Sequence, residues 1–170
     1  MFTAFVITVS DRSFRGERED LSGPSVAGFL AGKQFHVVGS AIVPDEAGAI
    51  GDAICGAIDN EGVDLVVTTG GTGLSPRDVT PEATLSVIDR HIPGFPEIMR
   101  KESIAKTAYA SFSRGVCGIR GKSIVINLPG SPKGAIENIE VIGDILRDAV
   151  REVRGEVADC SEKGIERLKE

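Results

Sequence analysis

Residues 64–84, DLVVTTGGTGLSPRDVTPEAT, join a short apolar run to a glycine-rich loop and then to the start of a helix. The apolar run 64–69 has the length and the valine content of a buried strand. Thr80 and Pro81 then supply an N-cap and a first-turn proline for a helix that we expect to reach about Arg90. A strand, a loop and a helix in this order predict one unit of an α/β sheet.

The segments on both sides of this unit continue the alternation of strands and helices. Apolar runs predict strands at 2–9, at 35–43 and within 115–128, the last as two short strands around Gly121. Expected helices cover Pro24 to about Leu30, 50–58, 96–106, and a final stretch from near Lys133 whose apolar stripe is Ile139, Ile142, Leu146, Ala149 and Val153. This alternation predicts a three-layer α/β/α fold with a mostly parallel sheet. We expect one domain over residues 1–153 and a charged tail, 154–170, outside its core.

Composition excludes several classes of protein. A net charge of −6 argues against a nucleic-acid surface, and no run approaches the ~20 apolar residues of a membrane span. The apolar N-terminal stretch lacks the charged lead of a signal peptide. Cys55, Cys117 and Cys160 are far apart without a CxxC pair, which indicates neither disulfides nor a zinc site. We therefore expect a cytoplasmic protein that contacts neither nucleic acid nor membrane.

The glycine-rich loop has the residue types of a phosphate site. Gly70, Gly71 and Gly73 remove side chains from a loop that follows a strand, where ligands of open α/β sheets bind. Consecutive N–H groups in such a loop can hold phosphate oxygens. Asp78, close to the helix start, is placed to bind a magnesium ion. The alternative interpretation is a flexible connector, because the loop matches neither the dinucleotide fingerprint nor the Walker motif.

Two other motifs are near misses. Residues 118–123, GIRGKS, lack the first glycine of a P-loop, since Val116 stands there, and they precede a predicted strand. We interpret this stretch as a hairpin turn. Residues 111–115, SFSRG, resemble the GxSxG elbow without its first glycine, and His36 and His91 are the two histidines of the chain. A serine hydrolase is therefore improbable.

Several ordered motifs resemble the MogA/MoaB family, most closely its MogA type and the gephyrin G domain. The motifs are TVSDR (8–12), DLSGPS (20–25), VPDE (43–46), TTGGTGLSPRDVTPEAT (68–84), PGFPEIMR (93–100) and RGVCGIRGKSIVINLPGSPKG (114–134). The resemblance covers residues 3–153. It implies the family reaction, in which Mg-ATP and molybdopterin give adenylyl-molybdopterin and pyrophosphate.

The resemblance also implies roles for individual residues. Asp45 and Asp78 match the family's two essential carboxylates and are the predicted catalytic residues and Mg²⁺ ligands, although a carboxylate after a proline is commonly a helix N-cap. The expected ATP and phosphate contacts are Thr69, Gly70, Gly71, Thr72, Gly73 and Arg77. The expected molybdopterin contacts are Asp11, Ser113, Asn127, Pro129, Gly130 and Ser131. Arg114 and Lys133 are further candidates for neutralising phosphates, with ordinary surface solvation as the alternative.

The resemblance implies a homotrimer and hand-over of product to a MoeA-like molybdenum insertase. Three alternatives to the enzyme stay open at this point. The first is a MoaB-type paralogue with weak or different activity, which the intact PRDVTPEAT string disfavours. The second is a non-catalytic scaffold domain, which would not need Asp45, Asp78 and the loop glycines together. The third is a nucleotide-binding sensor.

Overall fold

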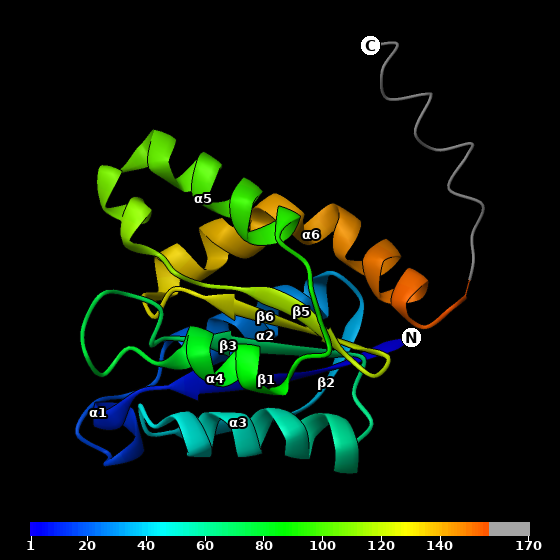
Figure 1. Ribbon diagram of the computed structural model, residues 1–170, viewed down its shortest axis with the longest axis horizontal. Helices are drawn as coiled ribbons and strands as arrows, with labels where there is room; N and C mark the ends of the chain where they lie inside the picture. The colour runs from blue at the N-terminus through cyan, green and yellow to red at the C-terminus, as the bar shows by residue number, and fades with distance from the viewer. Residues whose placement is uncertain (157–170) are drawn as a thin grey trace.

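Residues 1–156 are described by a computed structural model, in which six strands form one mixed sheet in the order β2-β1-β3-β6-β5-β4 (Figure 1). Four neighbouring strands are parallel: β2 (Phe35–Val43), β1 (Phe2–Val9), β3 (Leu65–Thr69) and β6 (Ser123–Leu128). The remaining two pair antiparallel at one edge: β5 (Cys117–Arg120) and β4 (Arg90–His91). The predicted mostly parallel sheet is confirmed.

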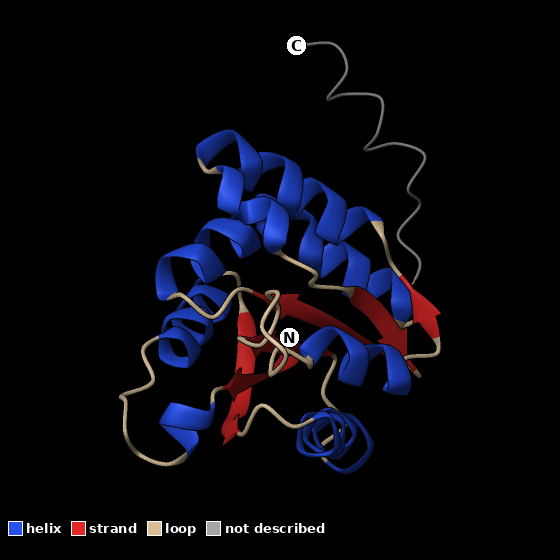
Figure 2. Ribbon diagram, turned by 60° about the vertical axis from the view of Figure 1, so that its left-hand side comes forward, coloured by secondary structure: helices blue, strands red, loops and turns tan. Residues whose placement is uncertain are grey.

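Helices cover both faces of this sheet, so the predicted three-layer architecture is confirmed (Figure 2). On one face lie α2 (Ser22–Gly32), α5 (Gly94–Lys106) and α6 (Pro132–Val153). On the other lie α3 (Ala47–Cys55), which continues as a π-helical turn (Gly56–Asn60), and α4 (Thr80–Val87). Two short elements complete the set: α1 (Asp11–Phe14) and a 3-10 turn (Ala108–Phe112). In the described part of the chain, no helix has the length and apolar character that crossing a membrane requires.

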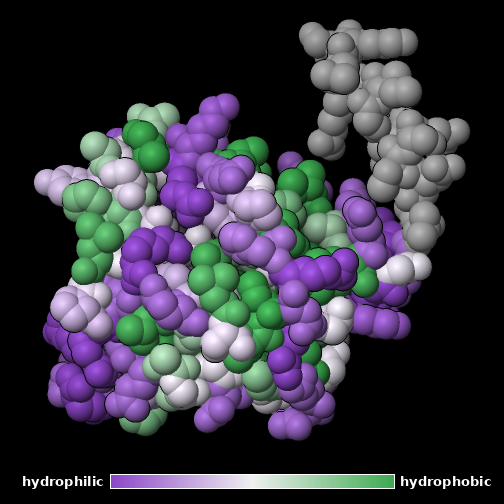
Figure 3. All heavy atoms as spheres, viewed as in Figure 1, coloured by the Kyte–Doolittle hydropathy of each residue, from purple (hydrophilic) through white to green (hydrophobic). Residues whose placement is uncertain are grey.

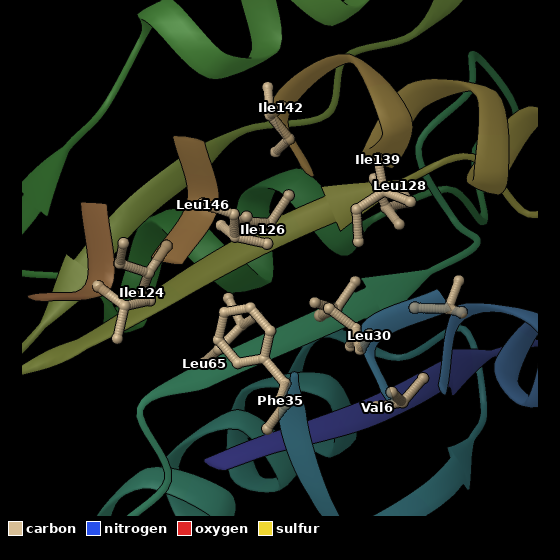
Figure 4. Close-up of a cluster of buried hydrophobic side chains, with 14 of the residues drawn as sticks. Val6, Leu30, Phe35, Leu65, Ile124, Ile126, Leu128, Ile139, Ile142 and Leu146 are labelled. Atoms are coloured by element: carbon tan, nitrogen blue, oxygen red, sulfur yellow. The ribbon is translucent and has the colours of Figure 1, made fainter. Parts of the chain in front are cut away.

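The core follows from the alternation of side chains along strands that are buried on both faces. Leu65 and Val67 of β3 point to the side of α2 and α6, whereas Val66 between them points to α3 and α4. Figure 4 shows the buried apolar cluster on the side of α2 and α6, where Leu30 of α2 and Leu146 of α6 pack against β3 and β6. Of the apolar stripe predicted for α6, three members are fully buried: Ile139, Ile142 and Leu146.

The helix predicted from Thr80 to Arg90 ends earlier, at Val87. The backbone N–H of Asp89 donates to the carbonyl of Ile119 in β5 at 2.7 Å. Arg90, the first residue of β4, is the strand partner of the same Ile119. The hydrogen bonds of residues 89–91 to the edge of β5 therefore end the helix before the local sequence would predict. Thr80 is the first helical residue rather than the N-cap, and its hydroxyl donates to the carbonyl of Gly70 at 2.9 Å.

At the other end of the predicted domain, Arg154 contacts the fold. Its guanidinium donates to the carboxylate of buried Asp64, which also accepts from the Thr3 backbone N–H at 2.7 Å. The guanidinium carbon lies 5.8 Å from the centre of the Phe2 ring. The first residue after α6 therefore takes part in domain packing. The rest of the expected charged tail, from 157 onward, lies outside the described residues.

Candidate active site

A pocket of about 300 Å³ opens where β1 and β3 end, next to the loop that follows β6. This is the edge of a parallel sheet at which ligands of α/β proteins bind. The first residues of two helices also border it, Ser22 of α2 and Pro132 of α6. The predicted site residues in its wall are Asp45, Thr69, Gly70, Gly71, Asp78, Gly130 and Ser131.

The glycine-rich loop is a fixed part of this wall rather than a flexible connector. Gly70 and Gly71 have φ angles of 111° and 63°, in the left-handed region that favours glycine. A Cβ on Gly70 would lie 2.2 Å from the carbonyl oxygen of Val9, and one on Gly71 would lie 2.3 Å from the Thr80 hydroxyl. The Thr80 N–H also donates to the Gly71 carbonyl at 3.1 Å. A side chain at either position would therefore collide with β1 or α4, so the loop passes here as bare backbone.

Arg114 holds the second half of the loop. Its Nε donates to the carbonyl of Gly73 at 2.8 Å, its Nη2 donates to the carbonyl of Asp78 at 2.5 Å, and its backbone N–H donates to the carbonyl of Thr72 at 2.9 Å. Its Nη1 pairs with Glu82 of α4 and lowers the pKa of that carboxyl. The guanidinium, a candidate for phosphate neutralisation, is thus occupied in fixing the loop.

Replacing Arg114 with alanine is expected to loosen the loop and to reduce kcat/KM for nucleotide roughly 10–100-fold, because small misplacements of catalytic groups are costly. Hydrogen exchange at the amides of residues 72–78 should quicken in parallel. Glu82→Gln is the matched control, since it removes the ion pair and keeps the bonds to the loop carbonyls. Equal losses in both variants would contradict a positioning role for the carbonyl contacts.

Asp45 lies just after β2 and Asp78 just before α4, and both line the pocket. The Asp45 Oδ2 accepts from the Asp11 N–H at 2.7 Å, and the Asp78 Oδ2 accepts from the Ser75 N–H at 2.8 Å. Asp45 does not cap α3, whose N-cap is Glu46. Burial, followed by the charges of Asp11 and Asp78, raises the pKa of Asp45. A cation between the two carboxylates would relieve this repulsion.

Each of these two carboxylates keeps one oxygen, Oδ1, without a hydrogen-bond partner in the described part of the chain. Oxygen donors of this kind suit Mg²⁺, which commonly takes one or two carboxylates and completes its shell with water and phosphate. Within residues 1–156, no three carboxylate, histidine or cysteine side chains gather closely enough to hold a metal ion alone. Asp45 and Asp78 thus offer two carboxylate oxygens of the kind that Mg²⁺ accepts.

Asp11 and Arg77 bind each other at the rim instead of lining the pocket. The Arg77 Nη2 lies 2.8 Å from both carboxylate oxygens of Asp11, and its Nε lies 3.1 Å from Oδ2. This pairing lowers the pKa of Asp11. The Asp11 carboxylate also accepts from the backbone N–H of Asp45 at 3.1 Å. The Arg77 Nη1 has no hydrogen-bond partner within residues 1–156, so Arg77 can reach a ligand at the rim while it stays paired with Asp11.

Asn127 belongs to the framework beneath the site. It is 2% exposed, and its amide nitrogen donates to the hydroxyls of Thr68 and Thr84, both at 2.9 Å. Its oxygen accepts from the Val116 N–H at 3.2 Å. The other predicted residues outside the pocket wall are Thr72, Gly73, Ser113 and Pro129, whose carbonyl accepts from the Thr69 hydroxyl at 2.7 Å.

The sequence interpretation missed the wall contributed by the DLSGPS motif. The Asp20 carboxylate accepts from the Thr8 hydroxyl at 2.6 Å and from the N–H groups of Ser22 and Gly23, both at 3.0 Å. This network starts α2 two residues before Pro24, where the helix was expected. The aspartate two residues before a Ser-Gly-Pro sequence was the available signal. Arg18, in the same wall, had no signal in the sequence.

Comparisons with known proteins identify the family to which this fold belongs. Residues 5–156 match a family described as "Probable molybdopterin binding domain". Molybdopterin adenylyltransferase from Helicobacter pylori strain J99 is 40% identical, over 95% of this chain and 93% of its own length. The Drosophila melanogaster molybdenum cofactor synthesis protein cinnamon is also 40% identical over 90% of this chain, which spans about a quarter (26%) of that longer protein.

Solved structures give the same result for the fold. The molybdopterin biosynthesis enzyme MoaB from Thermus thermophilus superposes with a TM-score of 0.87 at 47% sequence identity, covering 91% of this chain and 98% of its own. The molybdopterin biosynthesis Mog protein from Mycobacterium ulcerans gives 0.85 at 37% identity, over 90% and 99% of the two chains.

Proposed function

This chain belongs to the MogA/MoaB family of molybdopterin-binding domains, and from that membership we propose that it adenylylates molybdopterin in molybdenum cofactor biosynthesis. The observation that carries the proposal is the pocket itself, where Asp45 and Asp78 face a wall of glycine backbone at the strand ends. The reaction consumes ATP. An oxygen of the terminal phosphate of molybdopterin attacks the α-phosphorus, and pyrophosphate leaves as the bond to the β-phosphate breaks.

Transfer of this kind depends mainly on positioning and on neutralising charge. The N-terminus of α6 favours anionic groups in the pocket. The first N–H groups of α2 already donate to Asp20, and the Gly70 N–H donates to the Leu128 carbonyl at 3.1 Å. Thr69, Gly70 and Gly71 form the wall that we assign to the phosphates of ATP, with Thr72 and Gly73 continuing the loop. Gly130 and Ser131, on the loop after β6, form the wall that we assign to molybdopterin.

We assign the Mg²⁺ site to Asp45 and Asp78. A bound magnesium ion would neutralise phosphate oxygens and help to orient them. The free Oδ1 atoms and the raised pKa of Asp45 support this assignment. Arg77 is assigned to the phosphate contacts and Asp11 to the pterin contacts, both from the ion pair that they form at the rim. The contacts proposed for Ser113, Asn127 and Pro129 stay predictions, and for Asn127 the internal hydrogen bonds make positioning of the strand the simpler role.

The proposed function is tested by mixing the protein with Mg-ATP and molybdopterin and following pyrophosphate. We expect release that requires both substrates and stops without Mg²⁺. ATP binding without pyrophosphate release would point to a sensor or scaffold. Binding of both substrates with very slow release would point to a MoaB-type paralogue of different activity. Either result would contradict the adenylyltransferase.

Three further proposals concern the protein's surroundings. We propose a cytoplasmic homotrimer that passes its product to a MoeA-like insertase. Apolar side chains are available for a subunit or partner interface: Leu85, Tyr109 and Phe112 are 49%, 77% and 48% exposed. Figure 3 shows apolar side chains among polar ones on the face drawn there. Light scattering on the purified protein should give three times the mass of the chain.

A further inference from the structure

The wall of the pocket is acidic, although both proposed substrates carry phosphate. Its acidic side chains are Glu19, Asp20, Asp45 and Asp78. Mg²⁺ would offset Asp45 and Asp78, and three hydrogen-bonding neighbours surround Asp20. Among the described residues, Arg18 is the one basic side chain of the wall. A polyanionic substrate in this pocket would therefore meet one lining cation from residues 1–156, Arg18.

The other candidate cations are occupied or distant. Arg77 is bound by Asp11, and Arg114 is bound by two carbonyls and Glu82. Lys133, on the first turn of α6, is not part of the pocket wall. Arg114 thus stabilises the glycine-rich loop, and Arg77 is paired with Asp11 at the rim of the pocket. None of them offers a free guanidinium or ammonium group to the pocket.

Arg18 differs from its neighbours on the same segment. The Arg15 Nε lies 2.7 Å from the Glu17 Oε1. Glu17 is therefore already paired with Arg15 and not with Arg18. The Arg18 side chain is exposed and has no hydrogen bond or ion pair within residues 1–156. Its segment leads directly into Asp20 and the start of α2, whose network with Thr8 fixes that end to β1. The guanidinium is therefore unpaired and attached to an anchored wall.

We propose that Arg18 binds a substrate phosphate group in the pocket and is a specificity-determining residue of the reaction. The inference rests on the proposed function, which brings two phosphorylated ligands to this pocket. A guanidinium binds phosphate oxygens through two parallel hydrogen bonds, which suits a group that must be held in one orientation. The phosphate belongs either to the β,γ end of ATP, which leaves as pyrophosphate, or to molybdopterin.

Direct binding measurements separate these two sources. The Arg18→Ala variant and the wild type are titrated by calorimetry with inorganic pyrophosphate, with the non-hydrolysable analogue α,β-methylene-ATP, and with molybdopterin. Loss of one charge-assisted pair predicts a Kd about 10–100-fold weaker. Weaker pyrophosphate and analogue binding assigns Arg18 to ATP, and weaker molybdopterin binding alone assigns it to the pterin phosphate.

Arg12→Ala is the matched control. Arg12 is an exposed arginine six residues earlier, on α1, outside the pocket wall, and its side chain makes no hydrogen bond or ion pair within residues 1–156. The same change of net charge there should leave all three Kd values within about twofold, because exposed charges at a distance are screened by salt. Arg18→Lys should recover part of the binding, since the charge returns without the paired donors.

The outcomes separate this inference from the proposed function. Equal Kd values for Arg18→Ala and Arg12→Ala with every ligand would overturn the role of Arg18, whatever the wild type catalyses. A wild type that binds the ligands but never releases pyrophosphate would overturn the proposed function, and Arg18 would then be judged by binding alone. Matching thermal unfolding curves for the variants confirm that any loss arises at the site.

Discussion

Turnover is expected to fall about 10³-fold in Asp78→Asn and in Asp45→Asn, because each change removes one anionic ligand from the proposed Mg²⁺ site. The amides keep the shape of the side chains and can still accept from the Ser75 and Asp11 N–H groups that now contact the carboxylates. The fold should therefore survive, as circular dichroism would show. Initial rates of pyrophosphate release at saturating Mg²⁺ measure the loss.

Asp52→Asn is the control for these two variants. Asp52 lies on α3, is exposed, and takes no part in the pocket wall. It should retain wild-type turnover with the same change in net charge. Full activity in both Asp45→Asn and Asp78→Asn would remove the metal assignment and leave the pocket as a binding site without the proposed chemistry.

Asp45→Asn carries a second expectation, in stability. The pKa of Asp45 is raised in the folded protein, so its ionised form disfavours folding at neutral pH. Removing the charge should raise Tm there. The gain should shrink as the pH falls toward the ordinary aspartate pKa of 3.8, where the wild-type carboxyl also becomes neutral. Calorimetric melts at several pH values measure the difference. A lower Tm in the variant at neutral pH would contradict this electrostatic account.

Gly70→Ala is expected to have the largest effect on folding, with a loss of about 3 kcal/mol or more in the free energy of unfolding. The added Cβ would lie 2.2 Å from the Val9 carbonyl oxygen, and the φ of 111° is strained for any residue with a side chain. The loop must then move away from β1, so pyrophosphate release should fall with stability. Denaturant unfolding measures the first effect.

Gly28→Ala is the matched control for that change. Gly28 lies within α2, is exposed, and has open space where a Cβ would go. Alanine there should stabilise the protein by about 0.5–1 kcal/mol, because glycine is a poor helix former. A Gly70→Ala protein as stable and active as the Gly28→Ala protein would show that close backbone approach at Gly70 is dispensable.

Strands β1, β3 and β6 could be predicted because their burial gives continuous apolar runs in the sequence. The two residues of β4 are exposed and polar, so no such run predicts that strand. The end of α4 could not be predicted, because it depends on the pairing of Arg90 with Ile119, a partner 29 positions away. The start of α2 depends similarly on the hydroxyl of Thr8, which belongs to a different element. The helix propensity of a short segment contains no information about partners that lie far away in the sequence.

Pocket residues on the glycine loop could be predicted, since their spacing reflects backbone geometry and the family motifs. The state of the charged residues could not. The sequence favours Arg77 as a phosphate cation because it lies inside the loop, and makes Arg114 a further candidate, yet Asp11 binds the first and loop carbonyls bind the second. Arg18 lacks a motif and becomes visible only when the pocket wall is assembled. Contacts with residues far away in the sequence therefore determine which arginine side chain is available to a substrate phosphate.

The most direct test of adenylylation follows the fate of individual ATP phosphates. Two samples receive Mg-ATP and molybdopterin, one with radioactive label in the α-phosphate and one with label in the γ-phosphate. Transfer of the adenylyl group predicts that the α-label appears on the pterin product and that the γ-label appears only in pyrophosphate. An unlabelled pterin in the first sample, or a labelled pterin in the second, would contradict adenylylation by this protein.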